Sequence, residues 1–286
     1  MRFVALIFLV AVFLGGMAPR PGLAEAARVS GIDAVASALE DAMLLPELLD
    51  VMAREGAAYG GDLDRQFLQG SGGASWQAEV ERIYAPERLG PLFHAAFAAE
   101  LDHIGVDTRP ILAFLGSDLG QKIMRLELSA RDALLDDGIE EGARAMAARL
   151  EIEGDGRYKT LRRFVDANHL VDMNVSSALN ANVAFLKALS ASGGANTALP
   201  DDEILARVWA QEGEVRGETD AWLLAFGTLA YGPLPDAELD LYLAFSETAE
   251  GVALNRALFA AYDRMFVTVS GDLGGAVGRW MVGTNL

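Results

Sequence analysis

Glu100 and His103 are the residues whose types and spacing come closest to a metal-binding motif. The Glu-x-x-His spacing places a carboxylate and an imidazole on one face of a helix, as in carboxylate-bridged di-iron bundles. Asp166 and His169 form an imperfect second copy of the pair. A metal pair also needs acids from two further helices. The sequence selects no particular donors for that role among Glu40, Asp41, Glu127 and Asp132.

Simpler explanations exist for the same histidines. His103 precedes Ile104 and Gly105, so it suits a helix C-terminus, where a cationic side chain is favourable. His94 lies beside Phe93 in an apolar stretch and is expected to be a half-buried core residue. We therefore predict no metal site and no cofactor, and keep Glu100 and His103 as the candidates if a metal is bound.

Nucleophilic and phosphate-binding motifs are missing from the chain. It has no cysteine, which excludes disulfides, thiolate catalysis and zinc–thiolate centres. It has no Gly-x-Ser-x-Gly turn, and the glycine-rich stretch at 70–73 lacks the Gly-Lys-Ser/Thr of a phosphate loop. The sequence thus contains no convergent catalytic set, and we expect a protein that is not an enzyme.

The charge balance limits the classes of partner. Asp and Glu number 41 against 23 Lys and Arg, which gives a formal net charge of −18. Binding to nucleic acid or to anionic lipid rests on Lys and Arg, so neither partner is expected. A strongly acidic surface favours solubility and basic or cationic partners.

The N-terminus has the pattern of a secretory signal over residues 1–24. Arg2 gives a positive start, Phe3–Leu14 is an apolar run, and small residues favour cleavage after Ala24, with Ala26 the next candidate. No later segment approaches the roughly 20 apolar residues of a membrane helix. We therefore expect an exported, periplasmic or secreted protein without a membrane span once the signal is removed.

The elements that carry these residues are predicted to be helices throughout. Alanine and leucine are abundant, and apolar residues recur every three or four positions, as in Leu119, Ile123, Leu126 and Ala130. No stretch alternates at strand length. The expected fold class is all-α, a helical bundle with little or no sheet.

A repeated phrase indicates that the bundle is duplicated. Phe114, Ser117 and Gly120 recur without gaps 131 positions later, and a fixed offset indicates repeated structural units. The second copy of the phrase consists of Phe245, Thr248 and Gly251. The tetrapeptide Ser-Gly-Gly-Ala also recurs, at an offset of 121. We place two units at 27–152 and 157–286, related by a pseudo-twofold axis.

Each phrase has the features of a sharp corner between two helices. Ser117 and Thr248 precede strongly helical stretches, where a hydroxyl caps the first free backbone N–H groups. The glycine three positions later allows close approach of another element. A twofold arrangement would also let Arg125 pair with Asp263 and Arg256 with Asp132. The alternative is two independent surface arginines.

At the same residues the chain resembles the family called domain of unknown function 2059. That family has the motif Phe-x-x-Ser-Pro-x-Gly, often followed by Gln-Lys. Residues 114–122 match it, with Asp118 in place of the proline, and the copy at 245–251 is looser. The resemblance implies an exported helical protein and brings no activity or catalytic residues.

Three functions remain open at this stage. The first is a role in contacts with an envelope protein or with a second copy, for which the chain offers Trp76, Trp209, Trp222 and Trp280 as anchors. The second is a carrier of a small apolar or cationic ligand, held in an interior cavity. A large internal cavity lined by Phe93, Phe97, Phe114 and Phe245 would favour this function, and a densely packed interior would count against it. The third is a metal-dependent enzyme built on Glu100 and His103.

Overall fold

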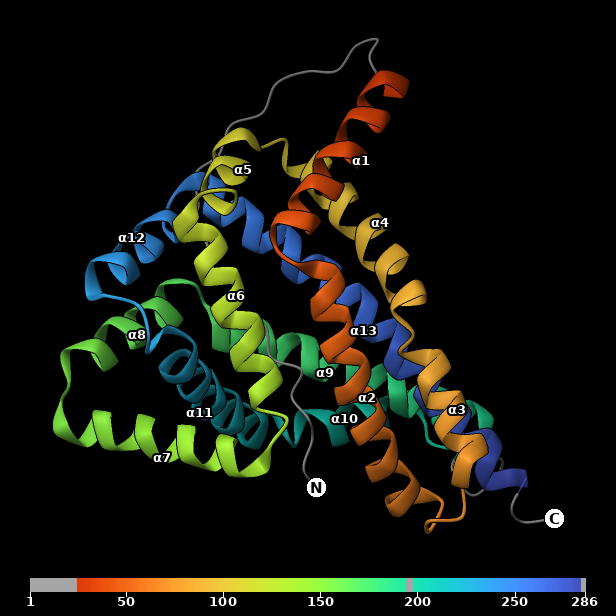
Figure 1. Cartoon of the computed structure of the whole chain (residues 1–286). Helices are drawn as coiled ribbons and strands as arrows, with labels where there is room; N and C mark the ends of the chain where they lie inside the picture. The colour runs from red at the N-terminus through yellow and green to blue at the C-terminus, as the bar shows by residue number, and fades with distance from the viewer. Residues whose placement is uncertain (1–24, 194–197, 284–286) are drawn as a thin grey trace.

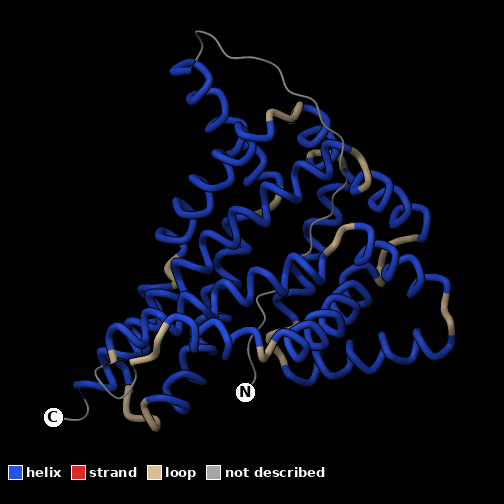
Figure 2. Tube along the Cα trace, turned by 180° about the vertical axis from the view of Figure 1, so that it is seen from behind, coloured by secondary structure: helices blue, strands red, loops and turns tan. Residues whose placement is uncertain are grey.

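The computed structural model describes residues 25–193 and 198–283. Over these residues the chain is helical, with short loops and no β-strand, as Figure 2 shows. The prediction of an all-α fold is therefore confirmed. The predicted signal at 1–24 and its cleavage after Ala24 lie outside the described residues.

The helices fall into an early and a late series. The early helices are α1 (Glu25–Ala42), α2 (Leu45–Phe67), α3 (Gly73–Ile83), α4 (Pro86–Ile104), α5 (Arg109–Leu115), α6 (Asp118–Ala133) and α7 (Asp137–Glu153). The late helices are α8 (Gly156–Ala167), α9 (Leu170–Ser192), α10 (Asp201–Trp209), α11 (Glu212–Tyr231), α12 (Asp236–Ser246) and α13 (Ala249–Gly283).

Helix α13 is the central helix of the fold. Its 35 residues correspond to a length of about 52 Å at 1.5 Å per residue. It packs against α9 and α4 over much of that length, and Figure 1 shows it running diagonally through the fold. Buried side chains occur around most of its circumference, which is typical of a helix surrounded by others.

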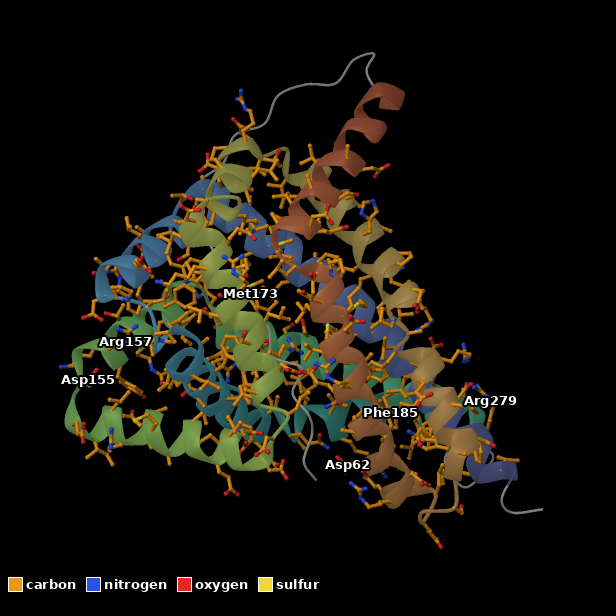
Figure 3. All side chains as sticks on the ribbon, in the orientation of Figure 1. Asp62, Asp155, Arg157, Met173, Phe185 and Arg279 are labelled. Carbon is orange, nitrogen blue, oxygen red and sulfur yellow. The ribbon has the colours of Figure 1, made fainter. Side chains whose placement is uncertain are left out.

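The contact between α9 and α13 depends on small residues. A Cβ atom added at Gly274 would lie 2.1 Å from the backbone oxygen of Phe185, and one at Gly278 would lie 2.7 Å from the backbone nitrogen of Gly193. Phe185, labelled in Figure 3, lies on α9 where that helix meets the lower part of α13. The two backbones therefore approach more closely than any larger residue at these positions would allow.

The two predicted units share one core. A single cluster of buried apolar residues includes members of both 27–152 and 157–286. The rings of Phe93 and Tyr262 lie 4.7 Å apart, and Trp76 meets Trp280 edge to face at 6.0 Å. The units are therefore not separate bodies in space.

Both predicted corners have the expected caps. The Ser117 hydroxyl accepts a hydrogen bond from the Gly120 amide at 3.0 Å, and Thr248 accepts one from Gly251 at 3.0 Å. A Cβ atom on Gly120 would lie 2.1 Å from the Phe114 oxygen, and one on Gly251 would lie 2.3 Å from the Phe245 oxygen. Glycine is thus required at both corners because the preceding helix ends against it.

The two corners meet in space. The Phe114 and Phe245 rings stack at 3.8 Å between centroids with an angle of 5°.

A further likeness between the two predicted units occurs at the start of α2 and α9, which are each 23 residues long. Each follows a residue with left-handed backbone, Leu44 with φ 57° and His169 with φ 50°.

The cross-pairing of the repeated charges is wrong. Arg256 binds Glu100 at 2.8 Å instead of Asp132. Asp132 binds Arg54, and Asp263 accepts a hydrogen bond from Asn180 at 3.1 Å. Arg256 and Asp132 are thus both engaged with other helices, Arg256 with Glu100 on α4 and Asp132 with Arg54 on α2.

None of the described helices is both long enough and apolar enough to cross a lipid bilayer.

Candidate functional site: an interior cavity

A mostly apolar cavity lies where α2, α6, α11, α12 and α13 come together. Its volume is about 100 Å³. Helices of both predicted units form its walls. The lining residues are Met43, Leu45, Leu48, Leu115, Met124, Glu127, Leu128, Arg131, Trp222, Phe226, Tyr242, Phe245, Ser246, Gly251, Leu254, Leu258 and Tyr262.

One face of α6 brings the charged groups to the cavity. Met124, Glu127, Leu128 and Arg131 follow the spacing of three and four residues that places side chains on one face of a helix. The orientation of α6 is fixed at its start by the Ser117 cap. Nearer its end, Arg131 ties it to α2 through Glu55.

The Glu127 carboxyl group accepts two tyrosine hydrogen bonds. The hydroxyl of Tyr231, the last residue of α11, donates to Oε1 at 2.7 Å, and that of Tyr242 on α12 donates to the same atom at 3.0 Å. Burial raises the pKa of Glu127 to about 7, although both hydrogen bonds act to lower it. Burial also raises the pKa values of Tyr231 and Tyr242 well above the ordinary tyrosine value, so both remain hydrogen-bond donors.

Arg131 and Glu55 form a buried two-point ion pair. Nε and one terminal nitrogen of Arg131 donate to the two carboxylate oxygens of Glu55, each at 2.8 Å. The arginine is 7% exposed. The charges of Arg131 and Glu55 cancel. The net charge of Arg131, Glu55 and Glu127 together therefore depends only on whether Glu127 is protonated.

Arg157 holds the corner that carries the two tyrosines. Its guanidinium group donates to the backbone oxygens of Tyr231 and Leu234, the latter at 2.6 Å, and pairs with Asp236. The side chain reaches these groups from the first turn of α8, near the label in Figure 3. This contact fixes the α11–α12 connection and so positions Tyr231 and Tyr242 around Glu127.

Comparisons with protein-family models, curated proteins and solved structures find no match to this chain. The resemblance to domain of unknown function 2059 therefore stays a prediction.

The predicted metal candidates lie away from the cavity. Glu100 is engaged by Arg256, and the exposed His103 lies in the last turn of α4. Among residues 25–193 and 198–283, no group of three or more histidine or carboxylate side chains is placed to hold a metal ion. Glu100 and His103 thus gain no third ligand within the described chain. His94 is half-buried, as expected, and bonds to Glu40 at 2.9 Å.

Of the four phenylalanines considered for a cavity lining, Phe245 alone is in the lining. Phe93 and Phe97 are fully buried and pack against each other, Tyr262 packs against Phe93, and Phe114 stacks on Phe245. The rings of Phe93, Phe97 and Phe114 thus pack against other aromatic rings and do not line the cavity.

From the sequence, Glu127 was named only as one of four possible metal donors, and Arg131 and Tyr242 were not named as site residues. The sequence does contain a signal for Glu127 and Arg131, because each places an ionisable group on an otherwise apolar face of a helix. Two further lining positions follow the 131-residue offset of the repeated phrase. Leu258 and Tyr262 lie 131 residues after Glu127 and Arg131, and all four line the cavity.

Proposed function

We propose that the protein binds a small, mostly apolar molecule in the cavity between α2, α6, α11, α12 and α13. The observation that carries this proposal is the cavity itself, about 100 Å³ in volume, with an apolar lining that contains a few convergent polar groups. Such a combination is typical of small-molecule sites. Apolar cavities of roughly 150 Å³ are known to bind benzene. This cavity has about two thirds of that volume, so a molecule with a single ring is the largest ligand we expect, and its entry requires small shifts of the lining side chains.

The proposal is for a carrier and assigns no reaction. Glu127 is held by two tyrosines and Arg131 by Glu55, so both charged groups of the lining have fixed partners. Fixed polar groups suit the orientation of a bound molecule.

Binding of toluene tests the proposal. We expect saturable binding, seen as chemical-shift changes of methyl groups in the lining, such as those of Leu254 and Leu258. Leu254→Phe fills the cavity and should abolish the changes. Leu241→Phe, at a 58% exposed position on α12, is the matched control and should leave them intact. Failure of toluene to bind the folded wild-type protein would overturn the proposal.

A second proposal is contact with another protein through α10. Trp209 is 66% exposed and lies one helical turn after Leu205, which is 44% exposed. The other tryptophans are engaged, since Trp76 packs on Trp280 and Trp222 lines the cavity. The net charge of −18 favours a partner with a basic surface over a second copy of the chain. A photo-crosslinker at Trp209 should capture one basic protein that a crosslinker at exposed Ile152 does not.

We further propose that the chain is exported by the signal at 1–24 and that its two units arose by duplication. Export is supported by the sequence pattern, and N-terminal sequencing of the mature protein checks cleavage after Ala24. Duplication is supported by the two similarly capped corners and by the left-handed residues before α2 and α9. The pairs of cavity positions 131 residues apart add to this support.

A further inference from the structure

We infer that the ligand of the cavity is an organic cation with an apolar body, such as a small aromatic or alkyl amine, and that the Glu127 carboxylate is its counter-ion. This inference rests on the proposed function, because it names the chemical class of the molecule bound in the same cavity.

The charges around the cavity lead to this assignment. Glu127 is the one carboxyl group among the lining residues. The other full charge in the lining, Arg131, is matched by Glu55 in a two-point ion pair. With Glu127 ionised, the three groups therefore sum to one negative charge. An anionic ligand would add a second negative charge, whereas an ammonium group restores neutrality.

The two tyrosine hydroxyl groups alone do not offset the negative charge of an ionised Glu127. Both hydrogen bonds fall on one oxygen, Oε1, from Tyr231 and Tyr242. Hydrogen-bond donors without charge offset only part of the cost of burying a carboxylate in apolar surroundings. A cation close to the same carboxylate supplies the missing compensation.

The aromatic lining suits a cation as well as an apolar body. Five rings line the cavity, and two of them, Trp222 and Phe226, stack at 5.1 Å. Faces of tryptophan, tyrosine and phenylalanine attract ammonium groups within about 6 Å of the ring centre. The rings of the lining are those of Trp222, Phe226, Tyr242, Phe245 and Tyr262.

Binding of a cation should depend on pH through Glu127. The groups that face it come from every helix packed around it. They are Tyr231 on α11, Tyr242 on α12, Tyr262 on α13, Arg131 on α6 and, through Arg131, Glu55 on α2. The tyrosines stay protonated near neutral pH because burial raises their pKa values. Glu127, with a pKa of about 7, is thus the group whose charge changes.

Two neutral and one cationic probe of similar shape test the inference. Affinities of toluene, benzyl alcohol and benzylamine are measured by calorimetry on the full-length protein between pH 6 and pH 8. We expect benzylamine to bind about tenfold more tightly than benzyl alcohol at pH 8. Its affinity should fall about tenfold from pH 8 to pH 6 as Glu127 is protonated, while that of toluene stays constant.

Variants assign the effect to one residue. In Glu127→Gln, whose fold is checked by its thermal transition, the preference for the amine over the alcohol should vanish. Glu141→Gln, at an exposed position on α7, removes the same charge from the surface and should keep the preference.

The outcomes separate the inference from the proposed function. Binding of none of the three probes would overturn both. Binding of toluene with no preference for benzylamine, or with a preference that does not vary with pH, would overturn the inference alone. If Glu127→Gln does not fold, the pH profile of the wild-type protein still decides the question.

Discussion

Glu127 is a single carboxyl group whose pKa is raised by burial, although hydrogen bonds from Tyr231 and Tyr242 on two other helices act to lower it. Its apolar surroundings raise its pKa to about 7, compared with 4.5 for an ordinary glutamate. The folded protein therefore binds a proton at this site between pH 4.5 and 7 that the unfolded chain releases. That difference contributes stability below pH 4.5, and the contribution is lost as pH rises through 7.

Replacement of Glu127 by glutamine should remove this pH dependence. The amide oxygen still accepts hydrogen bonds from Tyr231 and Tyr242 and has no charge to bury. We expect the variant and the wild type to be equally stable near pH 4.5. At pH 8 the variant should be more stable by about 3 kcal/mol, because the wild-type protein must then bury an ionised carboxylate whose pKa in the folded state is about 7. Urea unfolding at a series of pH values measures the difference.

The difference between the two profiles isolates Glu127 from Glu40, whose pKa burial also raises. Two parallel profiles would show that Glu127 has the same pKa in the folded and unfolded protein.

Single residues differ in how far the sequence reveals their role. The caps at Ser117 and Thr248 were predictable because their partners lie three residues away in the chain. The role of Glu127 was not, because Tyr231 and Tyr242 are 104 and 115 residues distant. Only the folded arrangement of α6, α11 and α12 brings these groups together.

At the scale of helices, the close approach of α9 and α13 depends on glycine at particular positions. Gly274 faces the backbone of Phe185, whereas Gly271, three residues earlier, has no atom within 4 Å of the place where a Cβ would be. The two glycines lie on one helix and differ in what they face. They form a matched pair for measuring the contact.

Gly274→Ala should destabilise the protein by about 3 kcal/mol, because the added methyl group overlaps a backbone oxygen and α9 must move away. Gly271→Ala should change stability by no more than about 1 kcal/mol, in the stabilising direction, because alanine favours a helix. Thermal unfolding followed by circular dichroism compares the two variants. Equal effects of both substitutions would contradict the tight contact.

The helices themselves were predictable, and their partners were not. Apolar spacing and caps indicated helices and corners at the right places, and the predicted boundary between the two units falls where α7 ends and α8 begins. These signals are local in the chain. Ion pairs such as Arg256 with Glu100 join residues 156 positions apart, and no local pattern indicates such a pairing.

At the scale of the molecule, the two units at 27–152 and 157–286 are interleaved. Helix α13 of the second unit packs on α4 of the first, and α11 packs on α6. Buried surface is therefore shared, and neither unit covers its own apolar faces.

We expect the intact chain to unfold in one cooperative transition and the two units, expressed separately, to remain unfolded or to aggregate. Tryptophan fluorescence and far-ultraviolet circular dichroism should give the same midpoint in urea, which is the sign of a two-state process. Trp76 and Trp280 report on the contact between the units because they touch across it. Two separate midpoints would show that the units fold independently.

The cavity positions that lie 131 residues apart differ in charge, which makes the proposed binding site asymmetric. Here Glu127 is opposed in the repeat by Leu258, and Arg131 by Tyr262. Both charged groups of the lining thus come from α6, so a bound molecule with two unlike ends is expected to take a single orientation.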